Sequence, residues 1–270
     1  MIYSPRYLNW RIKLDSMTRS DLKRHKNCHR AYMRKEFLIV FLLFSLAWQQ
    51  SYSEPFVAGL NAMDREHYAT AFRAWKGLAD SGEAEAQNNL GFLYQHGHGA
   101  KQSYTKAIRF YEMASDQGLP EATHNLGMLY FQGYGVPQNY DQAKRFFMKA
   151  AEKKLAASEY MLGLIYYQGH GLMQNYPRAK TYFVRAAKNG NVMGQFMLSF
   201  MLQVGEGHPD KEPEPLKAFI WSSIAIQNGY SEADSVLSFA KMQLTNSLQE
   251  KATEVANKCK SSGYKNSCPS

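Results

Sequence analysis

A set of landmarks that recurs every 36 residues constrains the fold of this chain more than any other feature. The first landmark is Leu-Gly or Leu-Ser, the second is Gly-x-Gly, and the third is a pair of alanines seven residues apart. They begin at Leu90, Leu126, Leu162 and Leu198, at Gly97, Gly133, Gly169 and Gly205, and at Ala107, Ala143 and Ala179. Because three landmarks share one period, the sequence predicts a repeat array.

The spacing inside each unit predicts two helices. In the second helix, Ala107, Phe110, Tyr111 and Ala114 follow the i, i+3, i+4, i+7 pattern of one apolar helix face. A glycine inside the first helix, such as Gly91, costs about 1 kcal/mol relative to alanine, so we expect a neighbouring helix to approach closely there. The Gly-x-Gly predicts positive φ angles where the first helix ends. The predicted fold is all-α, an α-solenoid of antiparallel helix pairs.

The array is predicted to occupy residues 54–243. Past residue 207 the register slips by three, and the segment 208–215 contains three prolines, which indicates a longer loop. A fifth unit then begins near Gly229, and reading backwards from the first landmark places another helix pair within residues 55–81. The remaining residues, 244–270, are predicted to form a C-terminal capping helix and a disulfide-closed tail.

The N-terminal segment has the layout of a secretory signal peptide. Arg34 and Lys35 precede an apolar run at 37–48, and Ser51 and Ser53 follow it. The run is shorter than the roughly 20 residues that span a bilayer as a helix, so we expect cleavage after Ser53 rather than a retained anchor. This predicts a signal peptide at 33–53 and a periplasmic or secreted protein. Residues 1–32 are then an untranslated upstream extension, since Met33 can serve as the start, or else a disordered tail on an uncleaved anchor.

The charge of the chain argues against a nucleic-acid partner. Residues 1–53 hold 10 Lys and Arg against 3 acids, which accounts for most of the net charge of +9. The rest of the chain is close to neutral and interleaves both signs. A groove that neutralises several phosphates needs clustered positive charge, which this sequence lacks.

The cysteines fit an exported protein. Cys28 lies in the predicted leader, which leaves Cys259 and Cys268 as the pair in the mature chain. An even count in an oxidising compartment predicts a disulfide. Two reduced thiols on a frayed terminus are the alternative.

The unit at 122–151 resembles the Sel1-like repeat, a relative of the tetratricopeptide repeat. It carries the pattern A-x-x-x-L-G-x-x-Y-x-x-G-x-G followed by A-x-x-x-[FY]-x-x-A-A, and the resemblance covers about residues 55–243. The resemblance implies an α-solenoid whose first helices line a concave surface and which serves as an adaptor or scaffold. Some cysteine-rich relatives are linked to β-lactam binding, but the repeats here contain no cysteine, so that assignment does not carry over.

No catalytic apparatus is recognisable in the sequence. Ser-x-x-Lys occurs at Ser103 and at Ser238, but the Ser-Asp-Asn and Lys-Thr-Gly motifs of penicillin-binding enzymes are missing. His96, His98 and His170 lie too far apart in a solenoid to share a metal, since helices pack about 8 to 10 Å apart. We therefore expect no catalytic residues, no metal and no cofactor.

The candidate binding residues are those near the turns that vary between units, because recurrent aromatic residues are expected in the core. Two positions vary: Gln95, Phe131, Tyr167 and Gln203 at one, and His98, Tyr134, His170 and Glu206 at the other. From these we predict a partner-binding set of Gln95, His98, Phe131, Tyr134, Tyr167 and His170.

The sequence thus predicts an exported scaffold or adaptor that binds a protein or peptide, or cell-wall material, on its concave face. No nucleic acid is expected, and the membrane is met only through the signal peptide. The alternative is a cell-envelope enzyme that acts on peptidoglycan or β-lactams.

Overall fold

The computed structural model describes residues 54–264 and 268–269, so the predicted extension at 1–32 and signal peptide at 33–53 lie outside the described residues. The chain divides into two compact units, residues 1–58 and 59–270. In the first unit, the described residues 54–58 are helical. In the second unit, the described residues form helices and turns with no strand. None of the helices described is both long enough and apolar enough to cross a bilayer.

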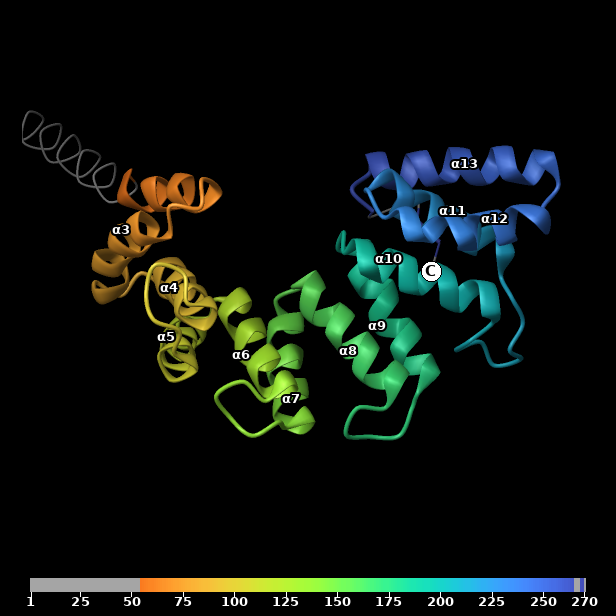
Figure 1. Cartoon of the computed structure of the whole chain (residues 1–270). Coiled ribbons are helices and arrows are strands. Elements are labelled where there is room, and N and C mark those ends of the chain that lie inside the picture. Colours follow the sequence, from red (N-terminus) through yellow and green to blue (C-terminus); the bar gives the residue numbers. More distant parts are fainter. Residues whose placement is uncertain (1–53, 265–267, 270) are drawn as a thin grey trace, which may run out of the picture. The chain divides into compact units, whose positions relative to one another are not determined.

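Nine helices of 13 residues follow one another from Tyr68 to Gln227 in the described part of the second unit. Each first helix packs against the second helix of its own unit and against the second helix of the unit before (Figure 1). The helices are α3 (Tyr68–Asp80), α4 (Ala84–His96), α5 (Tyr104–Asp116), α6 (Pro120–Gln132), α7 (Tyr140–Glu152), α8 (Ala156–Gln168), α9 (Tyr176–Lys188), α10 (Val192–Val204) and α11 (Pro215–Gln227). The predicted solenoid of helix pairs is confirmed.

The mid-helix glycines receive a large ring from the second helix of the same unit. A Cβ atom added at Gly91 would lie 2.6 Å from Cε1 of Tyr111, and one added at Gly127 would lie 2.7 Å from Cε1 of Phe147. Both rings are fully buried. The expected close approach of a helix at these glycines is confirmed, and an aromatic ring is the group that requires it.

A buried polar side chain near the start of each first helix forms hydrogen bonds to a neighbouring helix. Glu159 of α8 is 1% exposed and accepts hydrogen bonds from Arg185 Nε at 2.9 Å and Asn189 Nδ2 at 2.6 Å. Arg185 also donates to the carbonyl of Ala151 at the end of α7. The corresponding residues are Gln87, Thr123 and Gln195, which are buried and hydrogen-bonded in the same place. Since an unpaired buried polar group costs free energy, these contacts fix the register between units.

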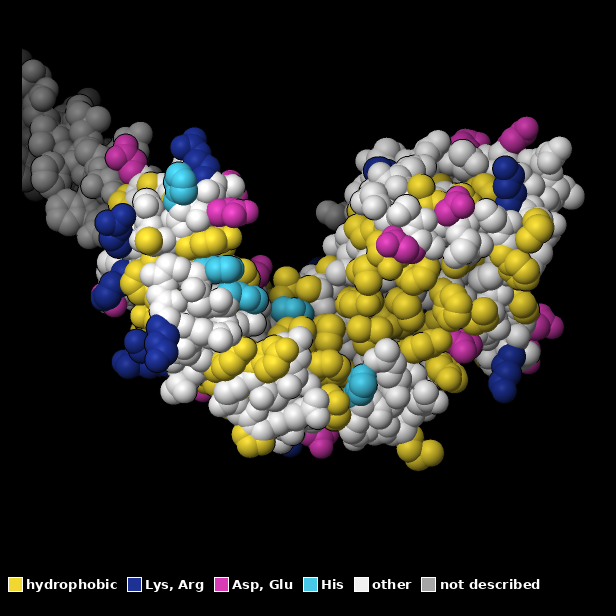
Figure 2. Space-filling view, in the orientation of Figure 1, with side chains coloured by type: hydrophobic (Ala, Val, Ile, Leu, Met, Phe, Trp, Pro, Cys, Tyr) yellow, Lys and Arg dark blue, Asp and Glu magenta, His cyan; other side chains and the backbone are white. Residues whose placement is uncertain are grey.

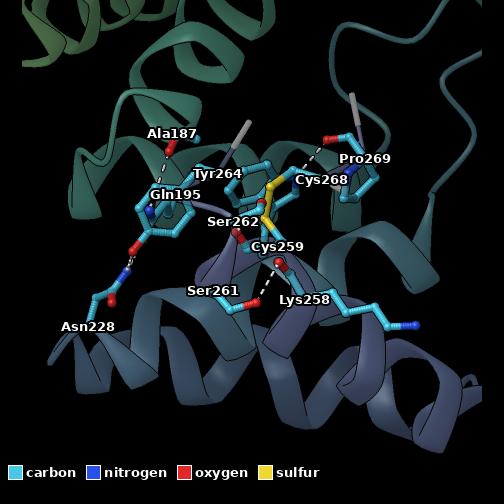
Figure 3. Close-up of a disulfide and its surroundings, with 11 residues drawn as sticks. Ala187, Gln195, Asn228, Lys258, Cys259, Ser261, Ser262, Tyr264, Cys268 and Pro269 are labelled. Carbon is cyan, nitrogen blue, oxygen red and sulfur yellow. Dashed lines mark hydrogen bonds between the residues drawn. A yellow bond between two sulfur atoms is a disulfide. The ribbon is translucent and has the colours of Figure 1, made fainter. Parts of the chain in front are cut away.

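The C-terminal region ends the array with elements that differ in length from the 13-residue helices before it. It consists of a 3-10 turn, η1 (Ser231–Ala233), and two helices, α12 (Asp234–Met242) and α13 (Asn246–Ser261). Cys259 and Cys268 form a disulfide, with Cα atoms 4.9 Å apart (Figure 3). The Trp221 indole N–H donates to the Pro269 carbonyl at 3.0 Å, so the tail is held against α11. Asn228 at the end of α11 donates to the Tyr264 hydroxyl at 2.8 Å.

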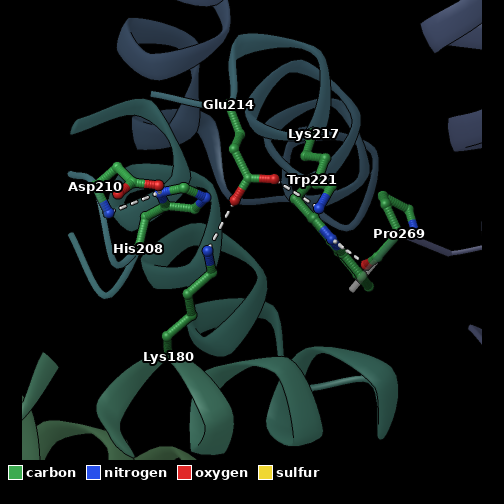
Figure 4. A network of polar contacts seen from close by, with 7 residues as sticks. All are labelled: Lys180, His208, Asp210, Glu214, Lys217, Trp221 and Pro269. Carbon is green, nitrogen blue, oxygen red and sulfur yellow. Dashed lines mark hydrogen bonds and ion pairs between the residues drawn. The ribbon is translucent and has the colours of Figure 1, made fainter. Parts of the chain in front are cut away.

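The longer loop before α11 is held by a carboxylate between two cations (Figure 4). Glu214 pairs with Lys180 of α9 at 2.8 Å and with Lys217 of α11 at 2.6 Å. Burial favours the neutral form of Glu214, but the hydrogen bonds and charges of the two lysines outweigh it and lower its pKa. The loop that departs from the 36-residue period is thereby tied to the unit before it.

Candidate functional site

The Gly-x-Gly turns hold each unit to the one before it. Gly133 has φ 75°, and its N–H bonds to the Leu129 carbonyl to end α6. Gly135, with φ 74°, lies so close to Tyr104 at the start of α5 that a side chain there would collide with it. The turns are therefore helix ends and contacts between units, as glycine alone allows both the left-handed angle and the approach.

The predicted residues in the middle of these turns stack on a recurrent tyrosine. His98 stacks on Tyr68 with ring centroids 4.1 Å apart, and His170 stacks on Tyr140 at 4.9 Å. Tyr134 stacks on Tyr104 at 5.3 Å and is 44% exposed. Each of the three rings thus joins two units, and each remains at least partly exposed.

The other predicted position contacts the second helix of the same unit. The Tyr111 hydroxyl donates to Gln95 Oε1 at 2.8 Å, and Phe131 lies 6.5 Å from Phe147 between ring centroids. Phe131 and His170 meet edge to face at 5.1 Å.

Tyr167 has ring neighbours in its own unit and a hydrogen bond to the next unit. It lies 6.4 Å from Phe183 and 5.4 Å from Tyr176 between ring centroids. Its hydroxyl donates to Glu206. Burial, followed by the hydrogen bond and negative charge of Glu206, raises the pKa of Tyr167 to about 12. Of the six predicted residues, only Phe131 and His170 form a ring pair with each other within the described residues.

A second surface was not among the predicted binding residues. It runs along the first helices, one and two helical turns before the position of Gln95 and Phe131. Its side chains change character along the chain. In α4 and α6 they are Asn88, Asn89, His124 and Asn125, whereas in α8 and α10 the corresponding residues are Tyr160, Met161, Phe196 and Met197. The signal that could have found them is the one used for the turns: these positions also differ from unit to unit at a spacing of 36 residues.

The apolar part of this surface is partly solvent-exposed. We define the apolar strip as Tyr160, Leu164, Phe196, Phe200 and Phe239. The first four pack on the core while remaining partly exposed, and Phe239 of α12, which occupies the register of Leu164 and Phe200, is 52% exposed. Apolar side chains gather over the part of the molecule labelled α8 to α10 (Figure 2). Met193 and Val204 lie on the same helix, α10, and are 38% and 43% exposed.

The polar part of the surface is internally bonded. Asn125 Nδ2 donates to Asn88 Oδ1 of the preceding unit at 2.9 Å. His124 Nδ1 lies 2.8 Å from Ser158 Oγ of the following unit. Burial lowers the pKa of His124 to about 4, so this imidazole is neutral at physiological pH.

The serine motif does not form a catalytic arrangement. Ser103 is the N-cap of α5, and its hydroxyl accepts from the backbone N–H of Lys106 at 3.3 Å. Ser238 is exposed on α12. The repeat register puts Ser238 at the position of Gly127 and Gly163, which predicts a packed residue, and its exposure shows that this prediction is wrong. Within the described residues, no group of three His, Cys, Asp or Glu side chains is placed to hold a metal ion.

The repeat units match a known family. The family model described as "Sel1 repeat" matches four adjacent segments, at 84–119, 120–155, 156–191 and 192–230, which together cover more than half of the chain. The chain belongs to the Sel1 repeat family. Sel1 repeat proteins are typically non-catalytic scaffolds that bind protein partners. No curated protein matches this chain in sequence.

Two solved structures share the Sel1 repeat fold with this chain. One is a Sel1 repeat protein from Oxalobacter formigenes, with 28% identity, a TM-score of 0.61, and coverage of 71% of this chain and 79% of that one. The other is c5321, a protective antigen of uropathogenic Escherichia coli strains with an SLR fold, at 28% identity and a TM-score of 0.64. That match covers 81% of this chain and 47% of c5321.

Proposed function

We propose that this Sel1 repeat protein is an exported scaffold that binds a partner protein on its concave face, the face of its first helices. The apolar strip is the surface that carries the interaction. Partially exposed aromatic side chains on α8, α10 and α12 are the observation on which the proposal rests.

The composition of the strip supports a protein partner. Contiguous exposed apolar patches on soluble domains mark interaction sites, and aromatic residues dominate the energetics of such sites. Tyr160, Phe196 and Phe200 are held by packing on the core, so little side-chain entropy is lost when they bind. The amides of α4 and α6 precede the strip along the first helices and are bonded to one another, so the apolar strip carries the interaction.

A photoreactive amino acid at Met193 in the intact chain tests the surface in cells. Met193 lies on α10 beside the strip, and Met148, 44% exposed on the second helix α7, is the matched control. We expect a single cross-linked protein from position 193, none from position 148, and loss of the product when Phe200 is replaced by serine. Equal cross-linking from both positions, or a product that survives Phe200→Ser, would count against the proposal.

Export is the second part of the proposal. The order of basic, apolar and small residues at 34–53 supports it, and so does the Cys259–Cys268 disulfide, because disulfides persist in oxidising compartments. Mass spectrometry of the purified chain should find an N-terminus just after Ser53. A chain that still begins at or before Met33 would overturn cleavage.

A further inference from the structure

Two polar side chains at the end of the apolar strip carry buried atoms without a hydrogen-bond partner. Gln203 of α10 is 6% exposed, and neither atom of its amide has a hydrogen-bond partner among the described residues. The same holds for one carboxylate oxygen of Glu206, three residues later, while the carboxylate accepts from the Tyr167 hydroxyl. A buried polar group without a partner costs free energy, and more if it is charged, so a free chain of this structure is destabilised here.

Gln203 lies at the end of the strip, in the last turn of α10. Phe200 precedes it by one helical turn on α10. In the register of the units, Tyr167 of α8 comes before it and Met242 of α12 comes after it, and Met242 is 76% exposed. A partner that covers Phe200 and extends toward Met242 therefore passes over this polar position.

The neighbouring cations are already engaged. Lys180, which packs near the Gly207 backbone beside Glu206, pairs with Glu214 at 2.8 Å, and Lys217 pairs with the same carboxylate at 2.6 Å (Figure 4). Glu206 is itself partly exposed on the turn after α10, and a rotation of its side chain would turn the buried, unpaired oxygen toward solvent.

The chemistry of this position selects a cationic donor. The unpaired oxygens, one on the Gln203 amide and one on the Glu206 carboxyl group, accept N–H donors, and the faces of Tyr167 and Tyr176 attract a cation. An anion would be repelled, and an apolar side chain would leave the oxygens unpaired. We propose that Gln203, Glu206 and Tyr167 form a receptor for one arginine or lysine side chain of the protein that docks on the apolar strip. This inference rests on the proposed function and names the partner's chemistry.

Selection of a random peptide library on the full chain tests the receptor. We expect the recovered peptides to carry one arginine or lysine among apolar residues. Replacing that residue by norleucine should weaken binding about tenfold or more, as loss of a buried charge-assisted contact does. Glu206→Gln should remove most of this preference, whereas Glu121→Gln, an exposed carboxylate on α6, should leave it unchanged.

A second variant separates binding from folding. Gln203→Leu removes both unpaired amide atoms while keeping an apolar shape, so it should raise the melting temperature of the free chain and still lower the preference for the basic peptide. Recovered peptides without an enriched basic residue, or a preference that Glu206→Gln leaves intact, would overturn the receptor but not the scaffold. Failure to recover any peptide whose binding depends on Phe200 would overturn both.

Discussion

The second repeat unit, which contains α6 and α7, and the fourth, which contains α10 and α11, solve the same packing problem in different ways. In the second unit, the ring of Phe147 lies against Gly127, and a Cβ there would collide with it. In the fourth unit the corresponding residues are Ser199 and Ser222, and each hydroxyl bonds to a carbonyl of its own helix. The large buried ring of the fourth unit is instead Trp221, which bonds to the C-terminal tail. The glycine is therefore required by the ring opposite it and is dispensable where the ring is missing.

The surface of the first helices also differs between the two halves of the array. Units one and two present Asn88 and His124 where units three and four present Tyr160 and Phe196. The core pattern that defines the repeat does not fix the residue at these positions, although His124 and Tyr160 lie beside the buried rings of Phe147 and Phe183 on the second helices. Regular units provide the frame, and the apolar strip distinguishes the C-terminal half as the candidate binding region.

The largest effect is expected from breaking the ring and glycine pair. Phe147→Ala should cost about 3 to 5 kcal/mol of unfolding free energy, as removal of a fully buried ring does. Gly127→Ser alone should cost about 1 to 3 kcal/mol through overpacking. In the Phe147→Ala background, Gly127→Ser should cost nothing further, because the colliding ring is gone. Chemical denaturation of the four chains measures this coupling, and additive costs would refute the pairing.

The next effect concerns the C-terminal region alone. Replacing both Cys259 and Cys268 by alanine should cost about 2 to 3 kcal/mol, the loss expected for a short closed loop. Hydrogen exchange should rise in α11 to α13 and stay unchanged in α6 to α9, since the tail contacts Trp221 and Asn228 of α11. A reducing agent should leave the double variant unaffected. Uniform loss of protection along the array would contradict a local role.

A smaller effect on folding stability is expected from a change of pH, and it comes from His124 in the polar part of the first-helix surface. The folded pKa of His124 is about 4, below the ordinary value of 6.5, so the unfolded chain takes up the proton first as the pH falls. The stability that His124 contributes is full above pH 6.5 and is lost as the pH falls toward 4. Between pH 7 and pH 5 this amounts to about 1 to 2 kcal/mol. His124→Asn should flatten thermal unfolding midpoints over that range, and an unchanged pH dependence would contradict the assignment.

The smallest effect is expected from the reverse substitution in the fourth unit. Ser199→Gly should cost only about 0.5 to 1 kcal/mol, the difference in helix propensity, because Ser222 occupies the register position of the rings that face the glycines. Matched measurement of Gly127→Ser, which is expected to cost more for a steric reason, sharpens the contrast. A cost for Ser199→Gly above that of Gly127→Ser would show that the fourth unit uses Ser199 for packing.

The fold was predictable from the sequence because its determinants recur. The 36-residue period, the glycines and the alanines indicated helix pairs, and the close approach at Gly127 was expected, although the ring responsible for it was not. The candidate site was harder to predict. His98 and Tyr134 were chosen because they vary, yet they stack on tyrosines of the preceding unit, a contact between residues about 30 apart that no local pattern encodes. Phe196 and Phe200 vary as well but follow no motif, so only the structure shows that they remain partly exposed.

The most direct test of the apolar strip uses methionines that the chain already carries. Met193 and Met197 lie on α10, whereas Met113 and Met148 are exposed or partly exposed on the second helices α5 and α7. Methyl NMR of the full chain, titrated with a peptide selected on it, should shift the Met193 and Met197 signals and leave Met113 and Met148 in place. Shifts confined to Met113 and Met148 would place binding on the second helices and contradict the account.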